Sequence, residues 1–76
     1  MNIQTVAQNL RNTIAGKEIH LAYVQKQINR QMQNLKEEDR TEQYANFVTK
    51  ELLKDNIDEL RRILQDVEQC IEKETT

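Results

Sequence analysis

Apolar residues in the first half of the chain recur every seven positions in two interleaved rows. One row consists of Ala7, Ile14, Leu21, Ile28 and Leu35. The other consists of Ile3, Leu10, Lys17, Val24 and Gln31. This alternating spacing of three and four residues places both rows on one face of an α-helix. The pattern predicts a first helix over about residues 3–36, with Lys17 and Gln31 as the polar interruptions of its apolar face.

A second heptad pattern fills the C-terminal half and predicts a helix over about residues 41–73. Its two rows are Leu53, Leu60 and Val67, and Ile57, Leu64 and Ile71. Between the two patterns, residues 36–43 include no apolar side chain. Asp39 with Glu42 fits a capping box there, and Thr41 is an alternative N-cap. We therefore predict a polar turn at about residues 37–41.

The two predicted helices are well matched as an antiparallel hairpin. Folding the chain near Glu38 and Asp39 aligns five apolar layers, namely Ala7 with Ile71, Leu10 with Val67, Ile14 with Leu64, Leu21 with Ile57, and Val24 with Leu53. The competing interpretation is one continuous helix about 110 Å long. Because both apolar patterns match a single turn, the hairpin is favoured.

Gly16 is the only glycine, and the chain has no proline. Sheet hairpins and tight turns normally use these residues, whereas good helix formers dominate here. The composition therefore predicts an all-α fold. Because glycine costs about 1 kcal/mol inside a helix, we expect a distortion of the first helix near Gly16.

The apolar faces are wider than a two-helix contact needs. The additional residues are Ala15, Ile19, Ala22, Leu52, Ile63 and Cys70. Each helix of a four-helix bundle faces two neighbours, so these residues predict an oligomer interface. We expect the hairpin to dimerise into a four-helix bundle, and higher oligomers remain open.

Near the turn the apolar pattern of the second helix changes phase. Tyr44, Phe47 and Val48, with Ala45 and Leu52, are rotated by about 100° from the row of Leu53. The hairpin register brings Met32 near them. The candidate partner-binding residues at this tip are therefore Met32, Tyr44, Phe47 and Val48. The alternative is that the tip cluster completes the dimer core.

Length and charge limit the class of protein. Seventy-six residues make a single helical domain, 1–76, and its core is small. The net charge of −2 combines a basic first half with an acidic second half. No segment approaches the ~20 apolar residues of a membrane span, and no secretory signal is recognisable. We expect a cytoplasmic protein that does not bind membranes.

The sequence contains no catalytic motif, so we expect no enzyme activity and no cofactor. One cysteine and one histidine, Cys70 and His20, do not supply a zinc site. We expect Cys70 to act as a small buried residue and His20 to lie at the surface. Lys17 sits opposite Leu60 in the predicted register, with its ammonium group reaching toward Asp58 or Glu59.

These features favour a small protein–protein interaction module, acting as an adaptor, a chaperone, or an inhibitor or regulator of another protein. Small polar helical proteins of this kind look similar to many encoded by phages and mobile elements. The pair Gln43-Tyr44 also resembles small type III secretion co-chaperones, and this likeness assigns no site.

Two other functions remain open. The first is an RNA- or DNA-binding dimer, similar to small plasmid copy-control proteins. Its basic face on the first helix would use Arg11, Lys26 and Arg30 together with nearby amides. The second is an oligomer that binds a small ligand between its helices.

Overall fold

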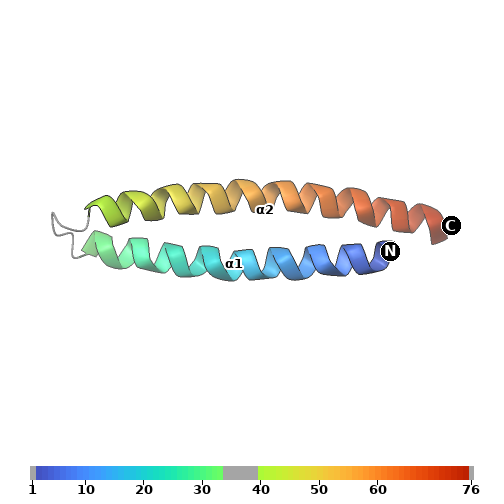
Figure 1. The fold of residues 1–76 in the computed structure, drawn as a ribbon, viewed down its shortest axis with the longest axis horizontal. Helices are drawn as coiled ribbons and strands as arrows, with labels where there is room; N and C mark the ends of the chain where they lie inside the picture. The colour runs from blue at the N-terminus through green and yellow to red at the C-terminus, as the bar shows by residue number, and fades with distance from the viewer. Residues whose placement is uncertain (1, 34–39, 76) are drawn as a thin grey trace.

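The computed structural model describes residues 2–33 and 40–75, and these residues form two long α-helices (Figure 1). Helix α1 spans Ile3–Gln33, and helix α2 spans Arg40–Thr75. The helices run antiparallel, side by side, in a rod of 59 × 18 × 14 Å. The prediction of an all-α hairpin is confirmed, and the alternative of one continuous helix is excluded. Most of the predicted polar turn, with Leu35 and Asp39, lies outside the described residues.

Asn2 caps the start of α1. Its side-chain Oδ1 accepts a hydrogen bond from the backbone N–H of Gln4 at 2.9 Å. Its backbone carbonyl accepts hydrogen bonds from Thr5 at 3.0 Å and Val6 at 3.2 Å. Asparagine is among the preferred N-cap residues because its short side chain reaches these free N–H groups. The cap therefore fixes the first residue of the helix.

At the turn end, charged side chains complement the helix dipoles. Arg30 lies in the last turn of α1, and Glu42 lies in the first turn of α2. A cation at a C-terminus and an anion at an N-terminus are each stabilising there. Because α2 begins at Arg40, Thr41 lies inside the helix, and the interpretation of Thr41 as its N-cap is wrong.

Helix α1 passes through Gly16 without a break, so the expected distortion there is absent. No glycine with a positive φ occurs among the described residues. Packing explains this result, because Ile14 is buried against α2 and holds the same turn of helix in place. The propensity cost of a single glycine is small compared with such tertiary contacts.

The core is a seam between the two helices, made by the predicted rows. Its fully buried members are Ala7, Ile14, Val24, Ile28 and Ile57. The remaining row residues in the described part of the chain are half-buried. All described residues of the predicted rows are therefore buried or half-buried in the seam.

Two cross-helix contacts, one toward each end of the hairpin, establish the register. Arg11 and Glu68 form an ion pair with 3.8 Å between Nη2 and Oε2. Near the turn, Asn46 Nδ2 donates a hydrogen bond to Gln31 Oε1 at 3.1 Å. Both contacts join residues that the predicted register places within two positions of each other. The register is therefore confirmed along most of the hairpin.

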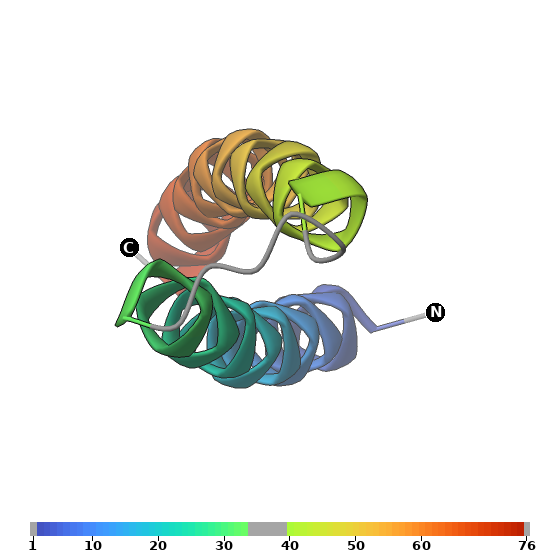
Figure 2. The same cartoon turned by 90° about the vertical axis from the view of Figure 1, so that its left-hand side faces the viewer.

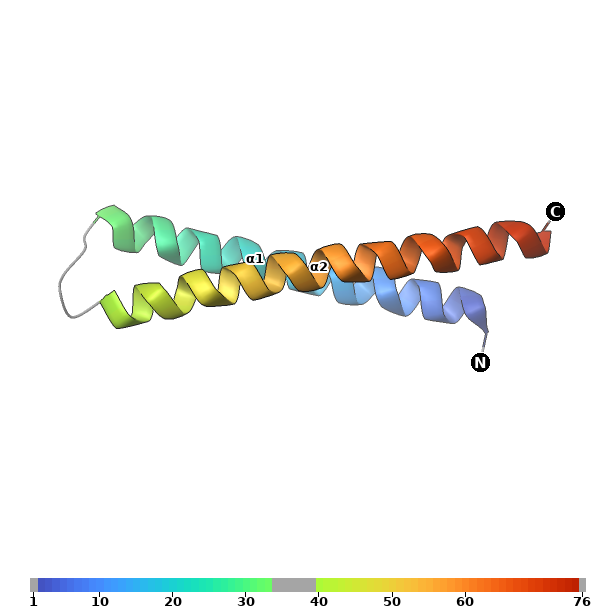
Figure 3. The ribbon, with the colours of Figure 1, turned by 90° about the horizontal axis from the view of Figure 1, so that it is seen from above.

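The seam becomes polar toward the turn. On α2 the half-buried positions there are Gln43, Asn46, Thr49 and Lys50. The apolar residues of this region instead lie outside the seam, as the phase change predicted. The helices cross at a shallow angle near their middle (Figure 3), and a view along the hairpin shows a single pair of helices (Figure 2). Both sides of the pair are therefore uncovered in the single chain.

Candidate protein-binding surfaces

The α2 residues that flank the seam form two columns on opposite sides of the hairpin. The first column consists of Phe47, Lys54, Arg61 and Glu68. The second consists of Thr49, Asn56, Ile63 and Cys70. Members of the two columns differ by two positions, which separates them by about 200° around the helix. We name these surfaces the Lys54 side and the Leu52 side, because Leu52 lies against Thr49 and Asn56.

Two ion pairs connect α1 and α2 along the half of the Lys54 side that is farther from the turn. Arg61 Nη2 lies 3.1 Å from Glu18 Oε1, and the Arg11–Glu68 pair lies farther from the turn. All four side chains remain about half exposed. Exposed pairs of this kind stabilise a fold by at most about 1 kcal/mol. Their main effect is to join the two helices along the part of this side that is distant from the turn.

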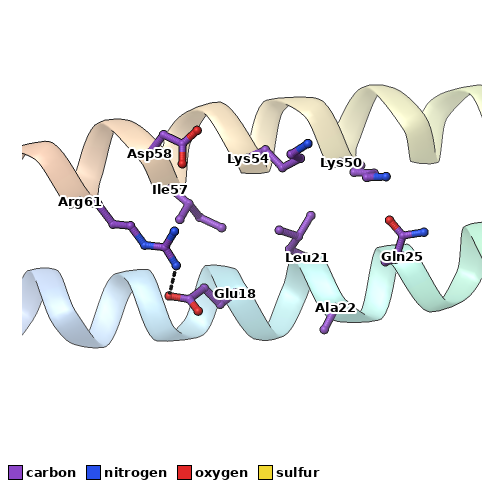
Figure 4. A pocket seen from close by; sticks show the side chains of 9 residues that line it. All are labelled: Glu18, Leu21, Ala22, Gln25, Lys50, Lys54, Ile57, Asp58 and Arg61. Carbon is purple, nitrogen blue, oxygen red and sulfur yellow. Dashed lines mark ion pairs between the residues drawn. The ribbon is translucent and has the colours of Figure 1, made fainter.

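A groove of about 470 Å³ opens on the Lys54 side next to the Glu18–Arg61 pair (Figure 4). Its apolar lining consists of Leu21, Ala22 and Ile57. Its polar lining consists of Glu18, Gln25, Lys50, Lys54, Asp58 and Arg61. Figure 4 shows that Leu21 and Ile57 point into the space between the helices. The groove therefore combines an apolar floor with charged rims.

Lys50 and Lys54 form the basic rim of this groove. Figure 4 shows both side chains extending from α2 near Leu21 and Gln25 of α1. Lys50 is half-buried, and Lys54 is exposed. Within the described residues, neither ammonium group has a carboxylate within ion-pair distance. The α1 residue at this level is Gln25, which carries no charge to balance them.

The predicted tip cluster adjoins the groove. Its members are Met32, Tyr44, Phe47 and Val48, and all are exposed. Met32 and Phe47 each lie one heptad beyond Gln25 and Lys54, so the register places them across from each other on the Lys54 side. Tyr44 is 73% exposed. The cluster therefore points away from the seam, and it lies beyond the groove toward the turn.

The six residues predicted for the oligomer interface do not share one surface. Ile63 and Cys70 belong to the Leu52 side, together with Leu52 itself. Ala22 lines the groove on the Lys54 side, and Ala15 precedes it by one heptad. Ile19 lies on the back of α1 and is 73% exposed. All six are exposed in the single chain, so the expectation that Cys70 is buried is not met within the hairpin.

The Leu52 side has a groove whose lining residues are mostly uncharged. This shallow groove is lined by Lys17, His20, Thr49, Leu52, Leu53 and Asn56. Lys17 is half-buried in the seam, as expected, and His20 is exposed. Among the described residues, Lys17 forms no ion pair with Asp58 or Glu59, and Asp58 lines the groove on the opposite side.

The candidate nucleic-acid residues are divided between distant parts of α1. Arg11 pairs with Glu68 on the Lys54 side, which partly neutralises its charge. Lys26 and Arg30 are exposed one helical turn apart. Fifteen positions separate Arg11 from Lys26, which corresponds to about 22 Å along the helix. The structure therefore does not bring the three cations into one patch.

The described residues contain no cluster of three or more His, Cys, Asp or Glu side chains arranged to hold a metal ion. In the same part of the chain, neither helix has the length and apolar character needed to cross a membrane. The notable surfaces of the described hairpin are therefore the two grooves and the tip cluster.

Comparisons with known protein families, with curated proteins and with solved structures found no match to this chain. The function is therefore inferred from the surfaces of the hairpin itself.

Proposed function

We propose that this protein is a non-enzymatic protein–protein interaction module that acts as an adaptor, a chaperone or an inhibitor of a partner protein. The observation that carries the proposal is the imbalance between buried and exposed apolar side chains. Five hydrophobic residues are buried in the described chain, whereas eight large ones are exposed. Burying one such side chain contributes about 1.5–3 kcal/mol, so a partner that covers several of them would bind favourably.

The arrangement of the exposed residues supports the same proposal. Tyr44, Phe47 and Val48 lie within about one and a half turns of α2, and Leu52 follows one turn later. Single exposed hydrophobic residues are ordinary, but a contiguous group marks an interaction surface. Aromatic residues and methionine are also enriched at protein interfaces. The tip cluster, with Met32, is therefore the candidate partner-binding surface.

A second copy of the chain is the proposed partner of the Leu52 side. Leu52, Ile63 and Cys70 are exposed on this side, where the pairing of two chains would bury them. A two-helix chain of this size has a small core and gains stability by association. Pairing through this side gives a four-helix bundle and leaves the groove and the tip cluster free on each protomer.

A pull-down with the intact protein tests the proposed function. The bait is compared with Tyr44→Glu/Phe47→Glu and with Gln65→Glu/Gln69→Glu, which adds the same two charges at exposed positions distant from the tip. We expect the wild-type and the Gln65/Gln69 variant to retain the same protein. The tip variant should lose this protein while its helix content, measured by circular dichroism, stays unchanged.

Two outcomes would count against this assignment. Retention of no protein above the level of an unrelated helical hairpin would remove the interaction module as a function. Loss of self-association in the tip variant, measured by light scattering, would instead identify the tip cluster as part of the dimer core.

A further inference from the structure

The cross-helix contacts on the Lys54 side follow a regular series that stops before the turn. Moving toward the turn, the first contact is Arg11 with Glu68 and the second is Glu18 with Arg61. One heptad farther, the residue that faces Lys54 is the uncharged Gln25. At the groove, therefore, Lys54 faces an uncharged side chain instead of a carboxylate. Among the described residues, α1 supplies no carboxylate across from Lys54.

Lys50 adds a second cation beside an apolar surface. It is half-buried, at a seam position one heptad from the buried Ile57. The long stem of a half-buried lysine packs on apolar groups while its ammonium group reaches the surface, so a carboxylate brought by a ligand can pair with it there. Asp58 lies one turn from Lys54, but no ion pair joins them. Two lysines at the rim therefore lack a partner among the described residues.

The floor of the groove fits the apolar face of a helix. The half-buried Leu21 provides apolar contact and the small exposed Ala22 allows a close approach, whereas Ile57 is buried and forms the base of the groove. From Glu18 to Met32 the surface runs about 21 Å along α1, which is the length of about four helical turns. Its end near the turn is the tip cluster, with Met32 and Phe47.

We propose that this groove binds an acidic amphipathic helix of a partner protein. The apolar face of that helix lies on Leu21 and Ala22, above the buried Ile57, and its carboxylates pair with Lys50 and Lys54. This assignment rests on the proposed function and specifies the chemistry of the partner. Of the acidic groups at the same rim, Glu18 is paired with Arg61, which leaves Asp58 against the two lysines.

A synthetic peptide that carries the proposed chemistry tests the assignment directly. The probe is an amphipathic helix of about 18 residues, with Leu at heptad positions and Glu on both flanks. One control peptide has Lys in place of every Glu, and another has the same composition in scrambled order. Binding is measured by fluorescence anisotropy, and the site by amide chemical shifts of the intact protein.

We expect the Glu peptide to bind and to shift amides in residues 18–32 and 47–61. Lys54→Glu should weaken binding by about tenfold, and high salt should weaken it further. Lys50→Glu/Lys54→Glu should in addition gain affinity for the Lys peptide. The matched control Lys26→Glu/Arg62→Glu changes two exposed cations on the backs of the helices and should leave binding of the Glu peptide unchanged.

Gln25→Glu provides a test that does not depend on removing a lysine. It places a carboxylate opposite Lys54, so it should weaken binding of the Glu peptide while leaving the helix content intact. Three results would overturn the proposal: no binding, amide shifts confined to the Leu52 side, or equal losses in the groove and control variants. If a captured partner protein still bound Lys50→Glu/Lys54→Glu normally, the groove assignment would fall while the interaction function stood.

Discussion

Ile28 and Ile19 show how position on one helix decides what a side chain contributes. Both are isoleucines of α1, but Ile28 is 1% exposed and Ile19 is 73% exposed. The heptad pattern predicted this difference, since Ile28 belongs to a row and Ile19 does not. Residues in the rows could be assigned from sequence because helix geometry fixes which side chains face the partner helix.

Ile28→Ala should therefore destabilise the protein strongly, by about 2–5 kcal/mol, because it leaves a cavity in the seam. Ile19→Ala is the matched control and should change stability by less than about 0.5 kcal/mol. Urea unfolding followed by circular dichroism measures both. Equal losses for the two variants would contradict the seam as described.

A substitution at Gly16 is expected to increase the stability of the protein. Gly16 lies inside α1 without a positive φ, and an added Cβ would meet nothing within 4 Å. Gly16→Ala should therefore stabilise the protein by about 1 kcal/mol and raise Tm by about 4–8 °C. A lower Tm would show that a neighbour, such as a second copy of the chain, lies close to this position.

Residue-level features differ in how far the sequence alone reveals them. Asn2 is a preferred N-cap type directly before the first row residue, so a cap signal was present in the sequence. The Glu18–Arg61 pair is different, because no local pattern reveals a contact between residues more than forty positions apart. Such contacts follow only after the register of the two helices is known.

At the scale of the helices, the sequence predicted the seam well except near the turn. Apolar rows specify a buried face, whereas polar residues give no comparable signal. Asn46 and Gln31 are therefore informative, because they continue the seam where its apolar rows end and bond to each other at 3.1 Å. A polar pair at such a position can set the register of two helices, at some cost in stability.

A double-mutant cycle measures this effect. Asn46→Leu should cost about 1 kcal/mol, since it leaves the amide of Gln31 without its partner. Adding Gln31→Leu should recover most of this loss, with a coupling energy of about 0.5–1.5 kcal/mol. Urea unfolding of the four proteins gives the coupling energy, and a value of zero would show that the hydrogen bond does not contribute to stability.

At the scale of the whole molecule, the hairpin has two different sides. The sequence identified the extra apolar residues, but it could not assign them to sides, because the columns become distinct only when both helices are in place. Ala15 and Ala22 consequently separate from Leu52, Ile63 and Cys70. This separation supports the proposal that the Leu52 side binds a second copy of the chain and the Lys54 side binds a partner protein.

The mass of the protein in solution tests this central claim most directly. At tens of micromolar, light scattering should give twice the 9.0 kDa mass of one chain. Leu52→Glu/Ile63→Glu should return the protein to a monomer, whereas Ile19→Glu, on the back of α1, should leave the dimer intact. A wild-type protein that stays strictly monomeric, or a dimer lost only in Ile19→Glu, would contradict the account.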